Sequence, residues 1–401
     1  MKILYVNPSS QLGGAERSLL DVICAVCDRD PWIEIVVLIT AGDGPLVTEL
    51  TAIGVKVILL ELPTKIAQLG DSDLKNQGKI ASLFALVGKL SALTEFGRYW
   101  QNLRRTIAEI APDIIHSNGL KTHLLVASLR TNTPIIWHLR DFIGSRSLIK
   151  QLLKLFVGRV TIAVAISQAI ARDWQSVFPQ LAIETIYNAI DLDKYRPQTT
   201  SSPSSSVKIG LIATYSLWKG HDIFIQAIGQ IAKQTPELKS TVRFYIIGGA
   251  IYETDRSQHS RTSLQQLASD LNVEDWLEFI DFQRDIVSSY NMLDIVIHAS
   301  TQPEPFGRTI VEAMACEKAV IVSKAGGAAE LFTERLDAIG VPPGDYLALA
   351  TAIQESISSP DLRIALGKAG RITVKNRFQR DRLGAEIITL YQKIDNLYCI
   401  K

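Results

Sequence analysis

Short runs rich in β-branched residues alternate with amphipathic stretches of about 10 to 20 residues along almost the whole chain. KILYV at residues 2–6 precedes one helical pattern, and IEIVVLIT at residues 33–40 precedes the next. A regular alternation of strands and helices predicts a parallel sheet with helices on both of its faces. We therefore expect an α/β fold, with about seven strands in the first half of the chain.

The alternation is interrupted at residues 197–206 by the sequence PQTTSSPSSS, and it restarts with VKIGLIAT at residue 207. A segment rich in Pro and Ser without apolar periodicity is typical of a linker. For a chain of 401 residues, a prior of about 150 residues per domain then predicts two doubly wound, Rossmann-like domains, at residues 1–196 and 207–380. Ligands of such sheets bind beyond the carboxyl ends of the strands, so the two domains should face each other across a cleft.

The charge of the chain is balanced overall but uneven along its length. Lys and Arg number 42 against 41 Asp and Glu, a net charge of +1, so we expect no nucleic-acid partner. Residues 75–159, however, contain 13 Lys and Arg against 4 Asp and Glu, a net charge of +9. Their apolar helical patterns carry basic and aromatic residues, which fits helices that rest on an anionic membrane surface. Ordinary amphipathic helices packed on the sheet would show the same pattern, and both interpretations stay open.

No segment has the features of a secretion signal or a membrane span. The run at the start of the chain is too short for a signal peptide, and the most apolar region, IASLFALVGKLSAL, is interrupted by Lys89. We expect a cytoplasmic protein, either free or peripheral on the inner face of the cell membrane. Cys24 and Cys27 lie in an apolar helical pattern without a second Cys or His pair, which predicts reduced thiols in the core rather than a metal site.

Gly13 and Gly14 follow the first predicted strand and open a helix. Backbone N–H groups without side chains in the way could approach a diphosphate there. A tight turn between a strand and a helix would need the same residues, so this pair alone is weak evidence for a ligand.

The most informative segment is STQPEPFGRTIVEAMA at residues 300–315, directly after the apolar run LDIVIHA. Its Pro and Gly residues predict a loop that leads into a helix, with Glu304 in the loop and Glu312 on the second turn of the helix. A carboxylate is a good acceptor for a sugar hydroxyl, although glutamates of this kind are usually solvated surface residues. Eight residues of helix rise about 12 Å, which disfavours a glycosidase pair with carboxyl groups about 5 to 9.5 Å apart.

With this segment, the chain resembles a retaining glycosyltransferase of the GT-B type, similar to family 4, over essentially its whole length. The resemblance rests on the E-x7-E motif from Glu304 to Glu312 and on the turn AGGAAE at residues 325–330, which resembles the family's GGxxE. It implies that Glu304 contacts the transferred sugar, that Glu312 holds the ribose hydroxyls of the nucleotide, and that Gly327 lies near the donor. It also implies that the final helix, residues 381–401, packs back onto the first domain.

Weaker matches extend the site that the resemblance implies. Lys219, after the first strand of the second domain, matches a family Lys that pairs with the donor phosphate, and His138 matches a His at the reacting sugar. Either residue alone has an ordinary structural alternative, a surface Lys or a packed His. We expect Glu304, Lys219 and His138 to be the catalytic residues. The expected donor-binding residues are Gly13, Gly14, Lys219, Glu304, Phe306, Gly307, Arg308, Glu312 and Gly327.

One departure from the family pattern concerns the phosphate site. The family commonly places an Arg five residues before the Lys, where this sequence has Thr214. Arg308, Arg140 or Arg284 could supply the missing charge, and the sequence does not decide among them.

The resemblance implies transfer of a sugar, with retention of configuration, from a nucleotide-diphosphate sugar to a hydroxyl of a sugar or lipid-linked acceptor. Because no residue presents itself as a covalent nucleophile, we expect front-face attack, with the leaving phosphate helping to deprotonate the acceptor. Lys219, an Arg and helix N-terminal amides would stabilise that phosphate, and we expect no metal or further cofactor. A non-catalytic nucleotide-sugar-binding or regulatory protein is the alternative. A dinucleotide-dependent oxidoreductase is weakened because no GxGxxG follows either first strand.

Overall fold

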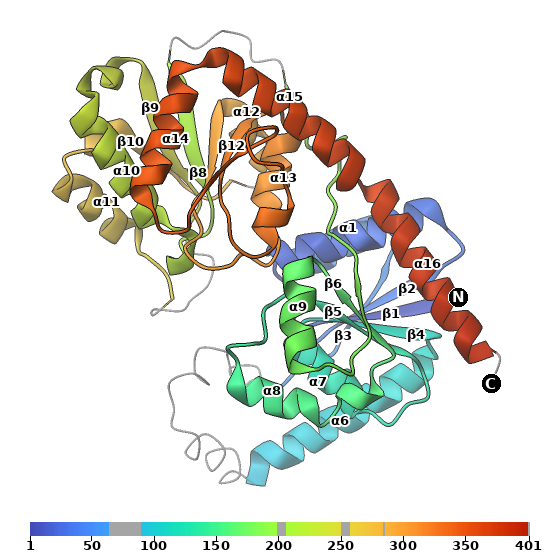
Figure 1. The fold of residues 1–401 in the computed structure, drawn as a ribbon. Helices are drawn as coiled ribbons and strands as arrows, with labels where there is room; N and C mark the ends of the chain where they lie inside the picture. Colours follow the sequence, from blue (N-terminus) through green and yellow to red (C-terminus); the bar gives the residue numbers. More distant parts are fainter. Residues whose placement is uncertain (64–89, 199–205, 250–256, 284, 400–401) are drawn as a thin grey trace. The chain divides into compact units, whose positions relative to one another are not determined.

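The chain forms two compact units (Figure 1). Unit 1 comprises Met1–Ala189 together with Arg380–Lys401, and unit 2 comprises Ile190–Gln379. The computed structural model describes residues 1–63, 90–198, 206–249, 257–283 and 285–399. Each unit contains one parallel sheet, so the predicted α/β fold with two doubly wound domains is confirmed.

The sheet of unit 1 has seven parallel strands in the order β3-β2-β1-β4-β5-β6-β7. The order reverses between β1 and β4, which pair in register from Ile3 opposite Ile114. This reversal is the topological switch point at which open α/β sheets bind their ligands. The strands are β1 Lys2–Asn7, β2 Glu34–Ile39, β3 Lys56–Leu59, β4 Ile114–Asn118, β5 Ile135–Leu139, β6 Ile162–Ala165 and β7 Ile183–Thr185.

Helices cover both faces of this sheet. Helices α1, α2 and α16 contribute to one core cluster together with alternate residues of the central strands, such as Ile3 and Tyr5 of β1. Figure 1 shows α6 and α7 on the side of the sheet opposite to α1 and α16. The helices are α1 Gly14–Arg29, α2 Pro45–Ala52, α6 Leu90–Ile110, α7 Leu120–Ser128, α8 Ser147–Lys154, the 3-10 turn η1 Val157–Arg159, α9 Gln168–Val177 and α16 Arg380–Cys399.

Helix α16 comes from the far end of the sequence and yet completes the core of unit 1. Its buried face includes Leu383, Ile387, Tyr391 and Ile394, at spacings of three and four residues that place them on one side of a helix. A side chain at Gly384 would collide with the backbone of Ala25, so glycine lets α16 approach α1 closely.

The sheet of unit 2 has six parallel strands in the order β10-β9-β8-β11-β12-β13, and it reverses between β8 and β11. Its strands are β8 Val207–Ile212, β9 Val242–Ile247, β10 Leu277–Ile280, β11 Ile295–His298, β12 Ala319–Ser323 and β13 Ile339–Val341. The helices are α10 His221–Gln234, α11 Arg261–Asp270, α12 Ile286–Met292, α13 Arg308–Ala315, α14 Tyr346–Ser358 and α15 Pro360–Arg377. Short 3-10 turns are η2 Leu217–Lys219, η3 Pro236–Ser240, η4 Glu274–Trp276 and η5 Gly327–Glu330.

The division between the units differs by a few residues from the predicted boundaries of 1–196 and 207–380. Residues 190–196 belong to unit 2, because Ile190 bonds to the backbone of Phe378 and Arg371 donates to the carbonyl of Tyr195. These contacts involve backbone groups, which composition does not reveal. Most of the predicted linker, residues 199–205, lies outside the described residues.

Cys24 and Cys27 lie on α1 as free thiols. Both are partly exposed, which corrects the prediction that they are core residues.

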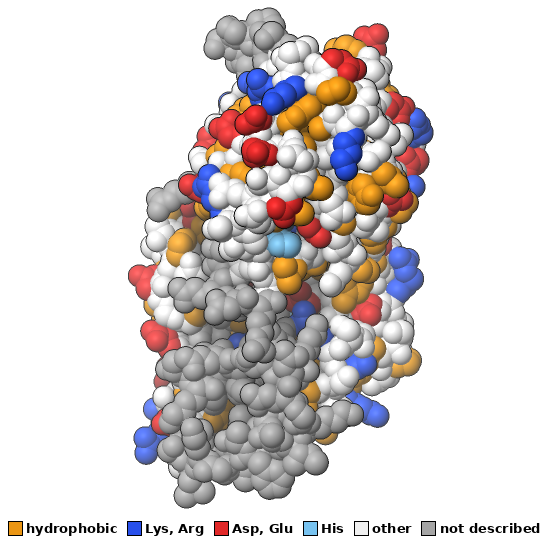
Figure 2. Space-filling model, turned by 90° about the vertical axis from the view of Figure 1, so that its left-hand side faces the viewer, with side chains coloured by type: hydrophobic (Ala, Val, Ile, Leu, Met, Phe, Trp, Pro, Cys, Tyr) orange, Lys and Arg blue, Asp and Glu red, His pale blue; other side chains and the backbone are white. Residues whose placement is uncertain are grey.

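Within the described parts of the chain, no helix combines the length and the apolar character that crossing a bilayer requires. On the coloured part of the face that Figure 2 shows, basic and acidic side chains are interspersed.

Candidate active site

The candidate site of unit 2 lies where the strand order reverses, at the carboxyl ends of β8 and β11. Lys219 ends the 3-10 turn η2 after β8, and Glu304 lies in the loop between β11 and α13. These two residues are 85 positions apart in the sequence, yet the Lys219 ammonium lies 2.8 Å from the Glu304 carboxylate. The parallel sheet therefore brings together the two residues in which the sequence analysis placed the donor chemistry.

The loop after β8 is held tightly against the loop after β11. The Thr301 amide donates to the carbonyl of Trp218 at 2.8 Å. Gly220, directly after Lys219, has the left-handed φ of 71°, and a side chain there would collide with the carbonyl of Ala299. Glycine is therefore required at residue 220, because no other residue combines this backbone conformation with so close an approach.

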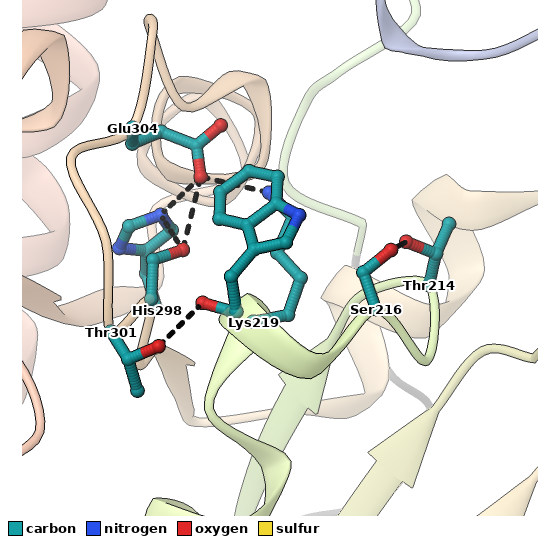
Figure 3. Close-up of polar contacts among 8 residues, drawn as sticks. Thr214, Ser216, Lys219, His298, Thr301 and Glu304 are labelled. Carbon is teal, nitrogen blue, oxygen red and sulfur yellow. Dashed lines mark hydrogen bonds and ion pairs between the residues drawn. The ribbon is translucent and has the colours of Figure 1, made fainter. Parts of the chain in front are cut away.

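One oxygen of Glu304 makes the side-chain contacts that Figure 3 shows for this residue. Oε2 accepts hydrogen bonds from Lys219 Nζ at 2.8 Å and Ser300 Oγ at 3.0 Å, and it lies 3.2 Å from Nε2 of His298. Figure 3 draws no contact at the other oxygen, Oε1. The carboxylate is thus fixed through one oxygen, while the second keeps its capacity to accept a hydrogen bond from a ligand hydroxyl.

The surroundings of Glu304 keep it ionised. The residue is only 7% exposed, and burial alone would raise its pKa. The Lys219 ammonium and the hydrogen bonds from His298 and Lys219 outweigh this effect and hold the pKa of Glu304 well below its usual range. The ammonium itself lies 3.9 Å from the centre of the Trp218 ring, a cation–π contact that further fixes its position.

The predicted turn at residues 325–330 lies against the backbone of Glu304. The Gly327 amide donates to the Glu304 carbonyl at 2.7 Å, and the Glu304 amide donates to the carbonyl of Ala325 at 3.2 Å. Gly326 has a φ of 65°, and a side chain there would collide with the backbone of Glu304. Lys219, Glu304 and Gly327 are therefore neighbours in the structure.

Glu312 lies on the second turn of α13, as predicted, with partners of its own. Its Oε1 accepts from Arg308 at 3.0 Å, and its Oε2 accepts from the hydroxyl of Tyr290 at 2.8 Å. Burial, followed by the nearby Glu312 charge, raises the pKa of Tyr290. The Glu312 carboxylate is thus anchored by one cation and one hydroxyl, and each oxygen can still accept a further hydrogen bond.

Of the two loop residues directly before α13, Gly307 shapes the backbone and Phe306 packs in the core. Gly307 is the N-cap of α13 with a φ of 100°. The Phe306 side chain is 3% exposed and packs edge-on against Phe378, with ring centres 5.9 Å apart. The side chain of Phe306 is therefore a core group, and its predicted contact with the donor stays a prediction.

The three candidates for the charge missing at Thr214 lie in different parts of the chain. The Thr214 hydroxyl lies 3.2 Å from that of Ser216 (Figure 3). Arg308 is bound to Glu312, Arg140 belongs to unit 1, and Arg284 lies outside the described residues. Lys219 is the Lys or Arg side chain that contacts Glu304 within the described residues, and the choice among the three arginines stays open.

The predicted site residues of unit 1 lie at the carboxyl ends of β1 and β5. Gly13 is the N-cap of α1, and a side chain at Gly14 would meet nothing within 4 Å, so local packing does not explain this glycine. His138 in β5 is 1% exposed, and burial lowers its pKa well below the usual value, so the imidazole is neutral. Its Nδ1 lies 3.1 Å from Nε2 of His116.

Sequence reasoning missed the residues that hold the two glutamates. His298 and Ser300 contact Glu304, and Tyr290 contacts Glu312. A signal was present for the first two, since polar residues that end a buried strand face the binding edge of a parallel sheet. Tyr290 carried no such signal, because an aromatic residue in an apolar helical pattern indicates a core position.

Comparison with known families gives two matches that together cover most of the chain. Residues 12–194 match the model described as Glycosyltransferase Family 4. Residues 196–373 match the model described as Glycosyl transferases group 1. The two matches meet within the segment that joins the two sheets.

Two curated relatives whose names describe glycosyl- or mannosyltransferases match about half of this chain. The chain is 24% identical over 221 residues to D-inositol 3-phosphate glycosyltransferase of Saccharomonospora viridis, covering 53% of this chain and 50% of that protein. It is 26% identical over 231 residues to a GDP-mannose-dependent phosphatidylinositol monomannoside mannosyltransferase of Mycolicibacterium smegmatis, covering 53% and 56%. The chain thus spans about half the length of these curated relatives.

Among solved structures, HepE of Anabaena in complex with UDP and glucose is similar over nearly the full length of both chains. The TM-score is 0.78 and the identity 26%, covering 98% of this chain and 99% of that one. The same Anabaena protein was also solved with UDP-glucose, at a TM-score of 0.77 and 26% identity.

Proposed function

Because this chain belongs to the group 1 glycosyltransferases with the GT-B fold, we propose that it transfers a sugar, with retention of configuration, from a nucleotide-diphosphate sugar to an acceptor hydroxyl. The observation that carries this proposal is the Lys219–Glu304 pair at the switch point of unit 2. It joins a cation for a diphosphate to a carboxylate with one oxygen available for a sugar hydroxyl. The similarity to a protein solved with UDP-glucose supports a donor of this class.

Each residue of unit 2 has a chemical role in this proposal. The Lys219 ammonium neutralises charge that develops on the diphosphate as it leaves, and Oε1 of Glu304 accepts a hydrogen bond from the transferred sugar. Glu312, fixed by Arg308 and Tyr290, accepts from the ribose hydroxyls. The backbone of Gly327, bonded to Glu304, borders the same site.

In this proposal the acceptor binds to unit 1, which also contributes residues to the donor site. His138 contacts the reacting sugar, and the Gly13–Gly14 turn at the start of α1 presents backbone N–H groups to the donor phosphates. The leaving phosphate takes the proton of the acceptor hydroxyl, so that attack and departure occur on the same face of the sugar. Same-face attack of this kind would retain the configuration of the sugar.

A screen of nucleotide sugars for thermal stabilisation, followed by turnover of the hits, tests the proposal. UDP-sugars come first, since the similar Anabaena protein was solved with UDP-glucose. A ligand at 100 times its Kd stabilises the protein by about 2.7 kcal/mol, which a melting curve detects. Release of nucleoside diphosphate that depends on an acceptor supports the transferase. Stabilisation without any turnover would instead indicate the non-catalytic nucleotide-sugar-binding protein.

Transfer should not need a divalent cation, because Lys219 and helix N-terminal amides supply the positive charge for the leaving diphosphate. We expect an excess of EDTA to change the rate of nucleoside diphosphate release by less than about twofold, which is about 0.4 kcal/mol in the barrier. A rate that collapses with EDTA and returns with Mg²⁺ would assign that charge to a metal.

We also propose that unit 1 touches an anionic membrane surface through α8, within the segment of net charge +9. Helix α8 buries Ile149 and leaves Leu152 37% exposed, while Leu155, just after the helix, is 71% exposed. Exposed leucines beside Lys150 and Lys154 match the composition of helices that lie on anionic lipid. A membrane-proximal or lipid-linked acceptor would be consistent with this surface. Residues 75–89 of the basic segment lie outside the described residues.

The protein should co-sediment with anionic vesicles but not with neutral ones. Each basic residue near an anionic surface contributes about 1 kcal/mol, so Lys150→Glu with Lys154→Glu should reduce the bound fraction several-fold at low salt. Lys150 donates one hydrogen bond to the carbonyl of Gly144, so the melting temperature should change little.

A matched control reverses two exposed lysines of unit 2, Lys368 and Lys375 on α15, which changes the net charge by the same amount. The control variant should bind vesicles like the wild type. If wild type ignores anionic vesicles even at low salt, α8 is an ordinary surface helix and a soluble acceptor becomes the better hypothesis.

A further inference from the structure

Four buried side chains of unit 1 form a continuous chain of hydrogen bonds that ends at His138. The hydroxyls of Tyr5 and Tyr391 lie 2.5 Å apart, and the Tyr391 hydroxyl lies 2.7 Å from Nδ1 of His116. Nε2 of His116 lies 3.1 Å from Nδ1 of His138. The four residues come from β1, α16, β4 and β5, so the chain connects the helix at the far end of the sequence with the carboxyl edge of the sheet.

The rings are also stacked, which fixes their orientation. Tyr5 and His116 have ring centres 4.8 Å apart, and His116 and His138 have ring centres 5.1 Å apart, with nearly parallel planes in both pairs. The last atom of the chain, Nε2 of His138, is buried and has no hydrogen-bond partner in the described part of the protein. A buried polar atom of this kind costs about 1 to 3 kcal/mol when it stays unpaired, so a ligand that pairs with it gains affinity.

All four groups are uncharged at neutral pH. Burial, followed by the charge of Arg140, lowers the pKa of His116 to about 3 and that of His138 well below its usual value. Burial raises the pKa of both tyrosines. Each imidazole therefore carries one N–H, and the protons can be arranged along the chain in only two directions.

Counting hydrogens selects between these directions. If His138 donated from Nδ1 to His116, and His116 donated on to Tyr391, the two hydroxyls would share one hydrogen bond, and one of their two hydrogens would have no acceptor among the described residues. In the other direction Tyr5 donates to Tyr391, Tyr391 donates to His116, and His116 donates to Nδ1 of His138. Every hydrogen is then bonded except the one at Nε2 of His138, which is the atom at the free end of the chain.

We infer that Tyr391 and His116 are positioning residues that hold His138 as the tautomer with its proton on Nε2. His138 then donates a hydrogen bond to an oxygen of the reacting sugar and cannot accept a proton from it at that atom. This inference rests on the proposed function for the contact with sugar. The tautomer itself depends only on the chain of hydrogen bonds.

Two phenylalanine substitutions test the direction, because each removes one hydroxyl from the same bonded pair. In Tyr391→Phe, the donor to His116 is lost, and the His138 proton is free to move to Nδ1. In Tyr5→Phe, the bond from Tyr391 to His116 remains. Both variants lose the bond between the two hydroxyls, and Tyr391→Phe loses the bond to His116 as well, so Tyr391→Phe should lower the melting temperature more.

The direct measurement is the tautomer of His138 from side-chain ¹⁵N shifts of the full-length protein. The chain has six histidines, and a spectrum of His138→Gln assigns the signal. We expect the Nε2–H pattern in wild type and in Tyr5→Phe, and a mixed or Nδ1–H pattern in Tyr391→Phe. Turnover should fall at least about fivefold in Tyr391→Phe, or about 1 kcal/mol, and less than about twofold in Tyr5→Phe. Binding of UDP should be unchanged in both variants.

Other outcomes would overturn the inference. An Nδ1–H pattern in wild type reverses the direction of the chain, and this measurement does not depend on any variant. An unchanged tautomer in Tyr391→Phe, or an equal loss of turnover in both variants, shows that the hydroxyls only stabilise the fold. Failure of the proposed function is separate, because it would appear as the absence of sugar transfer by wild type, with the tautomer pattern intact.

Discussion

Replacing Glu304 with Gln should lower turnover by about 10- to 150-fold, the equivalent of one charge-assisted hydrogen bond of about 1.5 to 3 kcal/mol. The substitution keeps the size of the side chain but removes the charge that Lys219 and the bonds from Ser300 and His298 fix in place. Free nucleoside diphosphate should still bind, because it lacks the sugar that Glu304 contacts. Steady-state kinetics and calorimetric titration with the nucleotide separate the two effects.

Glu312→Gln should behave differently, since Glu312 is assigned to the ribose. We expect free nucleoside diphosphate to bind about tenfold more weakly, or about 1.4 kcal/mol. Glu355→Gln is a matched control, because it removes a carboxylate that is paired with Arg335 on the surface of the same unit. It should affect neither measurement. An equal loss of nucleotide binding in Glu304→Gln and Glu312→Gln would contradict the two assignments.

Removing the Lys219 ammonium should have the other large effect. Lys219→Ala removes the cation proposed for the diphosphate, so kcat/KM should fall by about 10- to 150-fold, with the fold intact. Lys239→Ala is the control, because Lys239 pairs with Asp275 at an exposed site of unit 2. Near-normal activity of Lys219→Ala would show that a different cation stabilises the leaving group.

The same substitution should change how stability depends on pH. In wild type the pKa of Glu304 is depressed, so its contribution to stability is present above the ordinary value of 4.5 and is lost as the pH falls through the depressed pKa. Without Lys219, fewer groups oppose the effect of burial, so the pKa of Glu304 rises and the ionised carboxylate contributes less stability at neutral pH. The destabilisation by Lys219→Ala, about 1 to 3 kcal/mol, should therefore be largest at neutral pH. Melting curves between pH 4 and pH 7 would contradict this if the difference stayed constant.

Much of the fold could be predicted because parallel strands buried under helices are nearly continuous apolar runs. Strands such as β2, with the sequence EIVVLI, and β12, with the sequence AVIVS, follow such runs. Strand β13, Ile339–Val341, has no such signal, since it has three residues and includes a glycine. The exact boundary between the units depends on backbone bonds such as Ile190 to Phe378, which carry no sequence signal.

Only those parts of the site that are formed by residues close together in the sequence could be predicted. The spacing of Glu304 and Glu312 is local, because a loop and the helix that follows it carry both residues. The Lys219–Glu304 bond and the contact of Tyr391 with His116 join residues far apart in sequence, and only strand order and helix packing create them. Phe306 was assigned to the donor because it lies within the motif, whereas packing against Phe378 determines its position.

The return of α16 to unit 1 has a consequence for the order of events during synthesis on the ribosome. Unit 2 is continuous in sequence, from Ile190 to Gln379, and can fold as soon as it has emerged. Unit 1 starts first but cannot bury the surface reserved for Leu383, Ile387 and Tyr391 until α16 is made. An apolar strip along α1 therefore stays uncovered while about 190 further residues are translated, at about 5 to 20 residues per second. For that period of roughly ten seconds or more, this apolar strip of the nascent chain is exposed to solvent.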